Sequence, residues 1–532
     1  MLQASKLRLR RFARDAKGNV AILFGICVVP LLLAVGVAVD YGRALVVRDR
    51  MADAADSAAL AIGSWTGLTE SQLKAKAQQY FDANFPPSAI GTVGKLNVLF
   101  VGDDINVTVS GQVPTTFMRL ANVNQLDVGV DATITKKQRN IEVVLVLDTT
   151  GSMGSGGKLD ALKNAAKKMV ETLFGGNGTS DNVKIGVVPY AAAVNVGAGK
   201  LTSNPEWFDT NTYTTANNTA DPIAFEDLDK TSGISTIKLY KGSSTGLSNR
   251  SWAGCVRERS ANNNTTYELT DAPPSSSVAA SRWVPYLAPD EPDSASGTNF
   301  SNNYISDGGT NATCVVGTTT NDKRQCRTAK YKNTSVSSTS IGPDFSCPPA
   351  AITPMTNVAS TINTAIDALV AKGNTVIPAG LLWGWRVISP GAPFTDGVAY
   401  SNDKVVKAIV LLTDGDNDVS QGSNGFNKSV YNAFGFAKNG HLGLTSGSNA
   451  EATLDTKTTT VCNAIKTVNP DNPILLYTIG FQVTTASQNL LKNCASTDED
   501  GNKLFYNSPT NEQLASIFQD IAQGLSELRI AQ

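Results

Sequence analysis

The chain has 532 residues, which is enough for about three or four domains of ordinary size. Its 45 Lys and Arg residues almost balance its 46 Asp and Glu residues, which argues against a nucleic-acid-binding protein because such proteins carry a basic excess. A single histidine, His441, excludes histidine-rich zinc sites and leaves little room for a catalytic triad that uses histidine.

The N-terminal segment has the composition of a membrane anchor. Residues 1–19 form a basic tail, and residues 20–39 carry no charge. A helix over this uncharged stretch is about 30 Å long, the thickness of the hydrocarbon core of a bilayer. Because Lys and Arg are concentrated before the stretch, we expect the N-terminus to stay in the cytoplasm and the bulk of the chain to be exported. The sequence therefore predicts a single-pass membrane protein.

Two other interpretations of this segment remain open. A cleaved secretory signal would have a shorter apolar core, and no clean A-x-A cleavage site precedes the next helix. A pilin-type leader would be cut after Gly18, but prepilins usually carry Glu five residues later, where this chain has Leu23. We therefore expect the anchor to be uncleaved.

Two smaller units are expected between the anchor and the main domain. Residues 40–86 predict a helical stalk, in which apolar residues recur at helical spacing: Leu45, Met51, Ala55, Ala58 and Ala59. An Ala-rich face permits close packing on a partner helix, although alanine also simply favours helix formation. Residues 87–138 alternate apolar and polar side chains and predict a small β-rich unit close to the membrane.

The remainder of the chain, residues 139–532, predicts an α/β domain. Continuous apolar runs indicate buried strands at 141–148, 184–194, 404–412 and 474–481. Helical periodicity alternates with them at 158–174, 358–370, 380–388, 453–468 and 511–528. This alternation predicts a doubly wound, mostly parallel sheet with helices on both faces. A polar, Cys-bearing insertion at about 200–352 interrupts the domain, and its cysteines indicate an ordered segment held by disulfides.

Oxygen-bearing side chains follow two of the predicted strands. Asp148, Thr150 and Ser152 come at the end of the first strand, Asp414 follows the strand at 404–412, and Thr375 precedes the helix at 380–388. Ligands of doubly wound sheets bind at the carboxyl ends of the strands, so we expect these five residues to lie together. Hard oxygen ligands favour Mg²⁺, with Mn²⁺ as the second choice. The sequence thus predicts a metal site and no catalytic residues.

These segments resemble a von Willebrand factor A domain with its metal-ion-dependent adhesion site. The family pattern is D-x-S-x-S followed by a distant Thr and a distant Asp, and this chain has DTTGSM, GNT and LLTDG. Thr150 stands where the family more often has Ser and keeps the hydroxyl group. The resemblance implies that the bound ion takes an acidic side chain of a protein ligand. Metal-assisted hydrolysis would also need a general base, for which Asp416 and Asp418 are conceivable.

The N-terminal segment FARDAKGNVAILFGICVVPLLLAVGVAVDYGRALVVRDRMADAADSAALA narrows the resemblance. It is similar to the leader of TadG-like proteins of the Flp (tight adherence) pilus assembly system, as are WAGCV from Trp252 and GLLWGWRVISP from Gly380. The resemblance implies a pilin-like stalk and a non-enzymatic envelope protein of a Gram-negative bacterium, anchored in the inner membrane with the bulk of the chain in the periplasm. Such a protein would act in pilus assembly, anchoring or adhesion with pilus-assembly or pilin-like partners. The alternatives are a structural scaffold with an idle metal site and a metal-dependent hydrolase.

Six of the seven cysteines follow the anchor, and an even number in an oxidising compartment suggests disulfides. We predict that Cys462 pairs with Cys494. The other four allow three pairings, of which we favour Cys314 with Cys326 and Cys255 with Cys347. Two tryptophans are expected to pack the core against the insertion, with a partner-binding aromatic patch as the alternative: Trp383 and Trp385.

Overall fold

The structure is a computed structural model that describes residues 18–65, 68–85, 91–101, 104–135, 139–210, 236–259, 266–293, 300–307, 319–325, 328–420, 425–440, 442–443 and 449–528. It divides into two compact units, one that ends at Gln138 and one that comprises Arg139–Arg529. Each unit has its own hydrophobic core, and each is described by itself.

The first unit is built on one long helix, α2 (Gly18–Ser64). Within the described residues, Ile22–Gly63 is the one helical segment that is long and apolar enough to cross a membrane. Large apolar side chains near its start are exposed, as Leu32 is at 65%. These features identify a candidate membrane anchor, and the helix continues well past the uncharged stretch.

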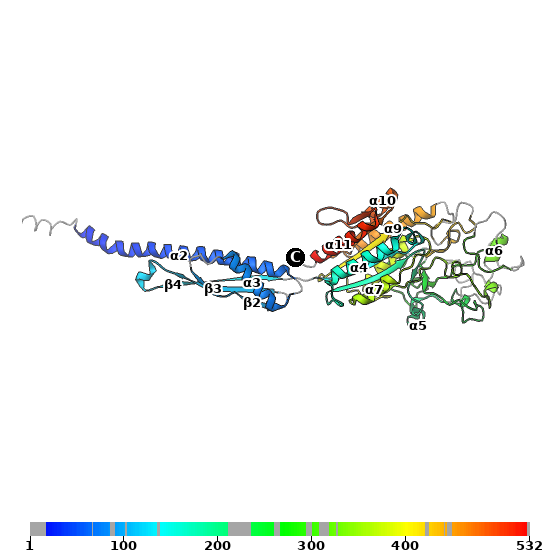
Figure 1. Ribbon diagram of the computed structural model, residues 1–532, viewed down its shortest axis with the longest axis horizontal. Helices are drawn as coiled ribbons and strands as arrows, with labels where there is room; N and C mark the ends of the chain where they lie inside the picture. The colour runs from blue at the N-terminus through cyan, green and yellow to red at the C-terminus, as the bar shows by residue number, and fades with distance from the viewer. Residues whose placement is uncertain are drawn as a thin grey trace, which may run out of the picture. The chain divides into compact units, whose positions relative to one another are not determined.

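A second helix and an antiparallel sheet pack on the C-terminal part of α2. Helix α3 (Glu70–Asn84) begins at a capping box in which the side chains of Thr69 and Gln72 each bind the other's backbone N–H. The strands are β1 (Thr92–Val93), β2 (Asn97–Val101), β3 (Asp104–Pro114) and β4 (Gln125–Thr135). Strand β3 pairs with the other three, and β3 and β4 run alongside α2 (Figure 1).

The helices and the sheet of this unit share one core. Its fully buried members come from both helices and from the sheet: Met51, Ala55, Ala58, Ala59 and Ile62 of α2, Ala77 of α3, and Val107 of β3. The alanines let the second layer approach α2 closely, because a methyl group takes little space between the elements. The sequence ranges 40–86 and 87–138 therefore bury their apolar side chains together.

The second unit contains a sheet of six strands in the doubly wound order. The strands are β5 (Asn140–Asp148), β6 (Val183–Tyr190), β10 (Thr353–Thr356), β11 (Val405–Thr413), β12 (Leu475–Phe481) and β13 (Phe505–Ser508). Their spatial order is β10-β6-β5-β11-β12-β13. All neighbours are parallel except β10, which is antiparallel to β6. The expected doubly wound, mostly parallel sheet is confirmed.

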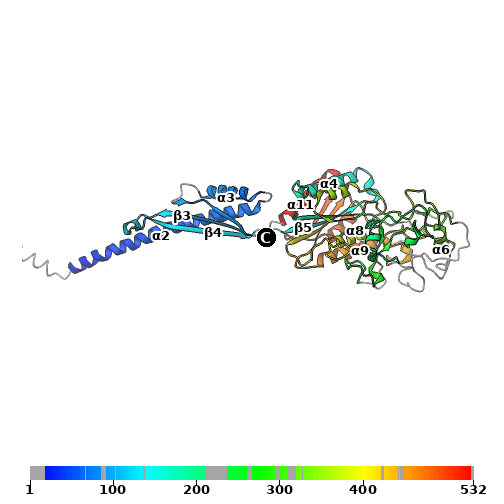
Figure 2. The same ribbon diagram turned by 90° about the horizontal axis from the view of Figure 1, so that it is seen from below.

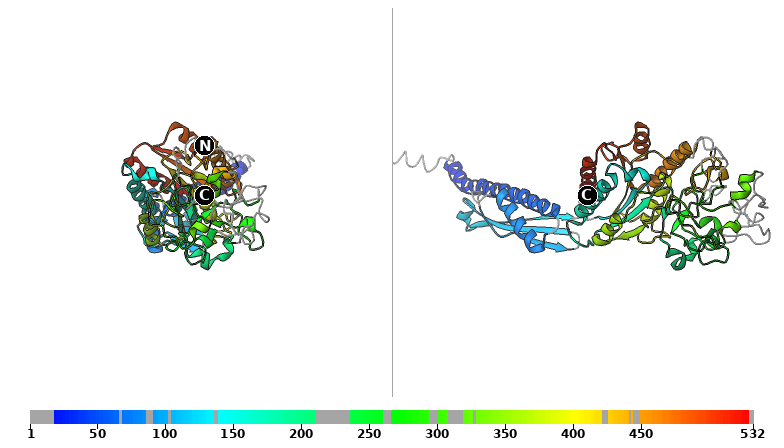
Figure 3. Two further views of the ribbon diagram at one scale, coloured as in Figure 1. Left: turned by 90° about the vertical axis from the view of Figure 1, so that its right-hand side faces the viewer. Right: turned by 45° about the vertical axis from the view of Figure 1, so that its right-hand side comes forward.

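Helices cover both faces of this sheet (Figures 2 and 3). One layer contains α4 (Lys158–Phe174), α7 (Ala359–Asp367) and α11 (Asn511–Leu528). The other contains α8 (Ile377–Ile388), α9 (Ala450–Thr467) and α10 (Thr485–Cys494). Successive side chains of β5 pack against opposite helix layers. Val143 and Leu145 belong to the core with α4, and Val144 and Val146 belong to the core with α8. This explains why β5 is apolar at every position from Val143 to Leu147.

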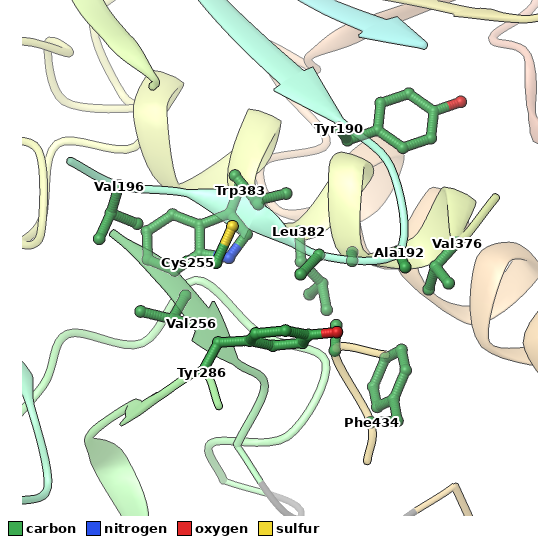
Figure 4. Packing of buried hydrophobic residues seen from close by; sticks show 14 of the residues in the cluster. Tyr190, Ala192, Val196, Cys255, Val256, Tyr286, Val376, Leu382, Trp383 and Phe434 are labelled. Atoms are coloured by element: carbon green, nitrogen blue, oxygen red, sulfur yellow. The ribbon is translucent and has the colours of Figure 1, made fainter. Parts of the chain in front are cut away.

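The described part of the insertion extends the sheet and shares the core of the α8 layer. Strands β7 (Val194–Asn195), β8 (Cys255–Arg257) and β9 (Val284–Pro285) continue from β6 in antiparallel fashion. Two short helices lie in the same region, α5 (Lys200–Ser203) and α6 (Thr320–Gln325). Figure 4 shows that Cys255, Val256 and Tyr286 of the insertion face Trp383 and Leu382 of α8, and all five belong to the same hydrophobic core. The insertion is therefore an integral part of the folded unit.

Two of the predicted disulfides are present, Cys255–Cys347 and Cys462–Cys494. Cys314 and Cys326 lie outside the described residues. The two disulfides close loops of 92 and 32 residues. On the chain-entropy estimate, each disulfide stabilises the fold by about 3–5 kcal/mol. Trp383 and Trp385 are buried, at 1% and 5% exposure, so they pack the core and do not form a surface patch.

Candidate metal centre

The site is assembled by the register of two parallel strands. In the pairing of β5 with β11, Leu147 lies opposite Leu412, so Asp148 and Asp414 leave the sheet at the same edge. The segment before α8 joins them through its backbone. Lys372 N donates to Thr149 O at 2.7 Å, and Gly151 N donates to Gly373 O at 2.8 Å. The three segments named from the sequence therefore meet.

Hydrogen bonds connect four of the five predicted residues. Thr150 Oγ1 lies 2.9 Å from Ser152 Oγ, and Ser152 Oγ donates to Asp414 Oδ1 at 2.6 Å. Asp148 accepts hydrogen bonds from Thr150 N and from Thr413 Oγ1, both at 2.8 Å. These bonds fix both carboxylates in place before any ligand binds.

The fifth residue, Thr375, lies in the adjoining segment and is 5% exposed. Its backbone pairs with that of Asp418, with N-to-O distances of 3.2 and 2.9 Å. Within the described residues its hydroxyl group makes no hydrogen bond, in contrast to the hydroxyls of Thr150 and Ser152. The structure therefore brings the backbone of Thr375 to the site without linking its side chain to the other four.

Two buried carboxylates give the site an excess of negative charge. Asp148 is fully buried and Asp414 is 6% exposed, whereas Ser152 is exposed and opens the site to solvent. Burial, and then the negative charge of Asp414, raise the pKa of Asp148 to about 6, against the opposing hydrogen bonds from Thr150 and Thr413. Lys158 Nζ lies 2.9 Å from Asp414 Oδ2 and supplies one positive charge. A divalent cation would offset the remaining charge.

Three residues of the site were not singled out from the sequence: Lys158, Thr413 and Tyr190. The Tyr190 hydroxyl donates to Leu412 O at 3.2 Å and lies 3.4 Å from Asp148 Oδ2. Burial, and then the charge of Asp148, raise the pKa of Tyr190, so it remains a protonated donor. A Cβ atom on Gly380 would lie 2.5 Å from Tyr190 Cγ, which shows that α8 approaches this ring closely only because it has glycine there.

The sequence did contain signals for these residues. Tyr190 ends β6, the parallel neighbour of β5, and Lys158 is the first residue of the helix that follows the DTTGSM motif.

The two acidic residues that were considered as general bases, Asp416 and Asp418, accept hydrogen bonds from other residues instead. Asp416 accepts hydrogen bonds from Thr484 and Ser487 at the start of α10, and Asp418 accepts one from Ser420 N.

The donor set fits a small hard cation. The described residues contain no cluster of three or more His, Cys, Asp or Glu side chains that could hold a metal ion. A metal at this edge would therefore depend on the hydroxyl groups of Thr150 and Ser152 together with the two carboxylates. Such all-oxygen sets suit Mg²⁺ and Mn²⁺.

Several solved structures are similar to the chain at low sequence identity. The von Willebrand factor domain of the type V pili tip protein Mfa5 from Porphyromonas gingivalis aligns with a TM-score of 0.31 and 12% identity, over 74% of this chain and 97% of that one. The pilus adhesin SpaC from Lactobacillus rhamnosus GG gives a TM-score of 0.30 and 10% identity, over 83% of this chain and 35% of that one. The pilus adhesin RrgA from Streptococcus pneumoniae gives 0.32 and 9%, over 82% and 49%.

The chain thus spans about a third to a half of the length of the SpaC and RrgA chains. No curated protein is significantly similar to it in sequence. The N-terminal segment, however, matches a known family. Residues 18–63, which comprise nearly all of α2, match the family described as "Putative Flp pilus-assembly TadE/G-like", and this confirms the resemblance expected for that segment.

Proposed function

We propose that this protein is a non-enzymatic, membrane-anchored component of an Flp/Tad pilus system, acting in assembly, anchoring or adhesion. Its second unit binds a protein partner through Mg²⁺ held by Asp148, Thr150, Ser152, Thr375 and Asp414, with Mn²⁺ as a substitute. The partner is another pilus-assembly or pilin-like protein that presents an acidic side chain. The family match of residues 18–63 supports the pilus association.

The observation that carries the binding role is the connected set of oxygens with one exposed member. Ser152 Oγ contacts both Thr150 Oγ1 and Asp414 Oδ1, and Ser152 itself faces solvent. In this arrangement the hydroxyls contact the ion directly and the two carboxylates act partly through bound water, so the ion keeps most of its positive charge. An acidic side chain from outside can then complete the coordination through a charge-assisted contact.

The disulfides and the anchor support the proposed location. Disulfides persist in oxidising compartments, and both of those described lie in the second unit. The basic residues before α2 favour a cytoplasmic N-terminus under the positive-inside rule. We therefore place the protein in the inner membrane with the bulk of the chain in the periplasm.

Replacing Asp148 by Ala should abolish capture of the partner. In intact cells, cross-linking followed by identification of the captured proteins measures this directly. We expect capture to fall at least about tenfold, which corresponds to a loss of about 1.4 kcal/mol or more of binding free energy. A chelator should produce the same loss in the wild-type protein, and the isosteric Asp148→Asn variant should behave like Asp148→Ala.

The matched control is Asp160→Ala, because Asp160 is an exposed carboxylate in the first turn of α4, close in sequence to the site. Its capture should equal that of the wild type. Unchanged capture in Asp148→Ala would instead favour the scaffold whose metal site is idle. Metal-dependent turnover of an ester or peptide substrate would favour the hydrolase.

A further inference from the structure

The tip of the β3–β4 hairpin is bound firmly to α2. Asp40 of α2 is 3% exposed, and its carboxylate accepts hydrogen bonds from three consecutive backbone N–H groups, those of Thr116, Phe117 and Met118, at 3.0, 2.7 and 2.7 Å. Arg43 Nη1 donates to Thr116 Oγ1 at 2.8 Å. The short helical turn Met118–Ala121 follows directly. These bonds hold the tip at one height along the helix.

That height coincides with the end of the uncharged stretch, residues 20–39. A Cβ atom on Gly36 would lie 2.5 Å from Phe117 Cβ, so the Phe117 side chain packs against α2 at a position inside the stretch. Gly36 precedes residue 39 by three positions, which places this contact about 5 Å inside the end of the apolar segment. Interfacial protein segments bury their apolar side chains about 5–10 Å into the membrane boundary.

The tip exposes apolar side chains at this level. Leu120 is 79% exposed, the highest value for a large apolar residue in the described part of the chain, and Phe117 and Val123 are 43% and 37% exposed. Between Pro114 and Gln125 the only charged residue is Arg119, which is also exposed. Apolar side chains with an adjacent cation are the composition of a segment that lies in a lipid headgroup region.

We propose that the tip, residues 115–124, is a second membrane contact that inserts into the outer boundary of the bilayer beside α2. The tip binds the lipid surface because it is continuous with the exposed apolar face of the membrane helix. Asp40 and Arg43 fix it to that helix. The inference rests on the membrane anchor of the proposed function. Two membrane contacts would also restrict how the first unit tilts on the membrane surface.

Fluorescence quenching by spin-labelled lipids tests this proposal. The full chain is reconstituted in vesicles of phosphatidylethanolamine and phosphatidylglycerol that contain lipids with a doxyl group on the acyl chain. An environment-sensitive thiol probe is placed at Leu120→Cys in a Cys27→Ser background. We expect blue-shifted emission and strong quenching by the doxyl lipids, and a loss of both when Phe117 and Val123 are also replaced by Asp.

Three control samples make the outcomes distinct. The probe on the native thiol of Cys27, which is free and exposed on α2, should be quenched and reports the anchor itself. The probe at Leu99→Cys, where β2 exposes 51% of an apolar side chain away from the tip, should not be quenched. Cys27→Ser without a new cysteine gives the background labelling.

Quenching at Cys27 with none at position 120 would overturn the tip proposal and leave the anchor intact. Absence of quenching at Cys27 would overturn the anchor, and the tip proposal with it. A blue shift at position 120 without lipid quenching would mean that another protein surface covers the tip, which also contradicts the proposal.

Discussion

Replacing Lys158 by Met is expected to tighten Mg²⁺ binding about tenfold, or about 1.4 kcal/mol, because the lysine ammonium competes with the metal for Asp414. Lys158 Nζ lies 2.9 Å from Asp414 Oδ2, and the Asp414 side chain has no exposed surface. Removal of the ammonium leaves two buried carboxylates whose mutual repulsion a bound cation relieves. Isothermal titration calorimetry of the two proteins gives the affinities.

The same substitution should lower stability when metal is absent. In the presence of a chelator, Asp414 becomes a buried charge without its ion pair, which costs about 3 kcal/mol on the scale of broken buried pairs. Saturating Mg²⁺ should restore most of this stability by binding the folded state. The unfolding midpoint of full-length protein in detergent, measured with chelator and with Mg²⁺, separates the two effects.

Lys168→Met is the matched control for both measurements. Lys168 lies on the same helix and pairs with Glu171, but both side chains are exposed, at 45% and 61%, so this pair contributes little. The control should change neither Mg²⁺ affinity nor the unfolding midpoint. Equal Mg²⁺ affinity in Lys158→Met and the wild type would contradict the competition between ammonium and metal.

Replacing Arg386 by Ala is expected to destabilise the second unit by about 3–5 kcal/mol, the cost of breaking a buried ion pair. Arg386 is fully buried in α8, and its Nη1 lies 3.0 and 2.8 Å from the two carboxylate oxygens of Glu258 in the insertion. The guanidinium also lies over the rings of Trp283 and Trp383, at 5.0 and 4.9 Å from their centroids. The variant loses these contacts and leaves Glu258 buried without its partner.

Urea titration followed by tryptophan fluorescence measures this effect, because two tryptophans flank the lost guanidinium. The double variant Arg386→Met with Glu258→Gln is the control, since neutral residues at both positions remove the buried charge as well as the pair. It should recover much of the stability lost in Arg386→Ala. A loss below about 1 kcal/mol in the single variant would show that the insertion is held in place by other contacts.

The mostly parallel sheet and the metal-site segments could be predicted from the sequence because strong patterns mark them. Strands β5 and β11 are largely apolar, apart from Glu142 and Lys407, and each ends in a short polar motif. Several short elements were missed for the opposite reason. Strands β10 and β13 have four residues each, too few for periodicity to stand out, and α10 is a short helix.

The face of α2 that packs on the sheet was only partly predicted. Met51, Ala55, Ala58 and Ala59 are fully buried as expected, but Leu45 is 41% exposed, and Ala44 and Val47 are buried in its place. In a helix rich in alanine and valine, neighbouring positions are equally apolar. The sequence alone therefore does not specify which of them faces the core.

The roles of Lys158 and Tyr190 depend on tertiary structure. Tyr190 reaches Asp148 because β6 pairs with β5 in register, with Tyr190 opposite Asp148, and because Gly380 lets α8 press on its ring. Lys158 reaches Asp414 across 256 residues of sequence. Neither contact follows from a local motif, which is why the sequence predicted the oxygen ligands without the groups that tune their charge.

Calorimetric titration of the full-length protein with Mg²⁺ tests the central claim most directly. The account predicts saturable binding of a single ion per chain, which is lost in Asp414→Ala and retained in Asp160→Ala. Absence of saturable binding in the wild-type protein, or equal binding in the wild type and Asp414→Ala, would contradict it.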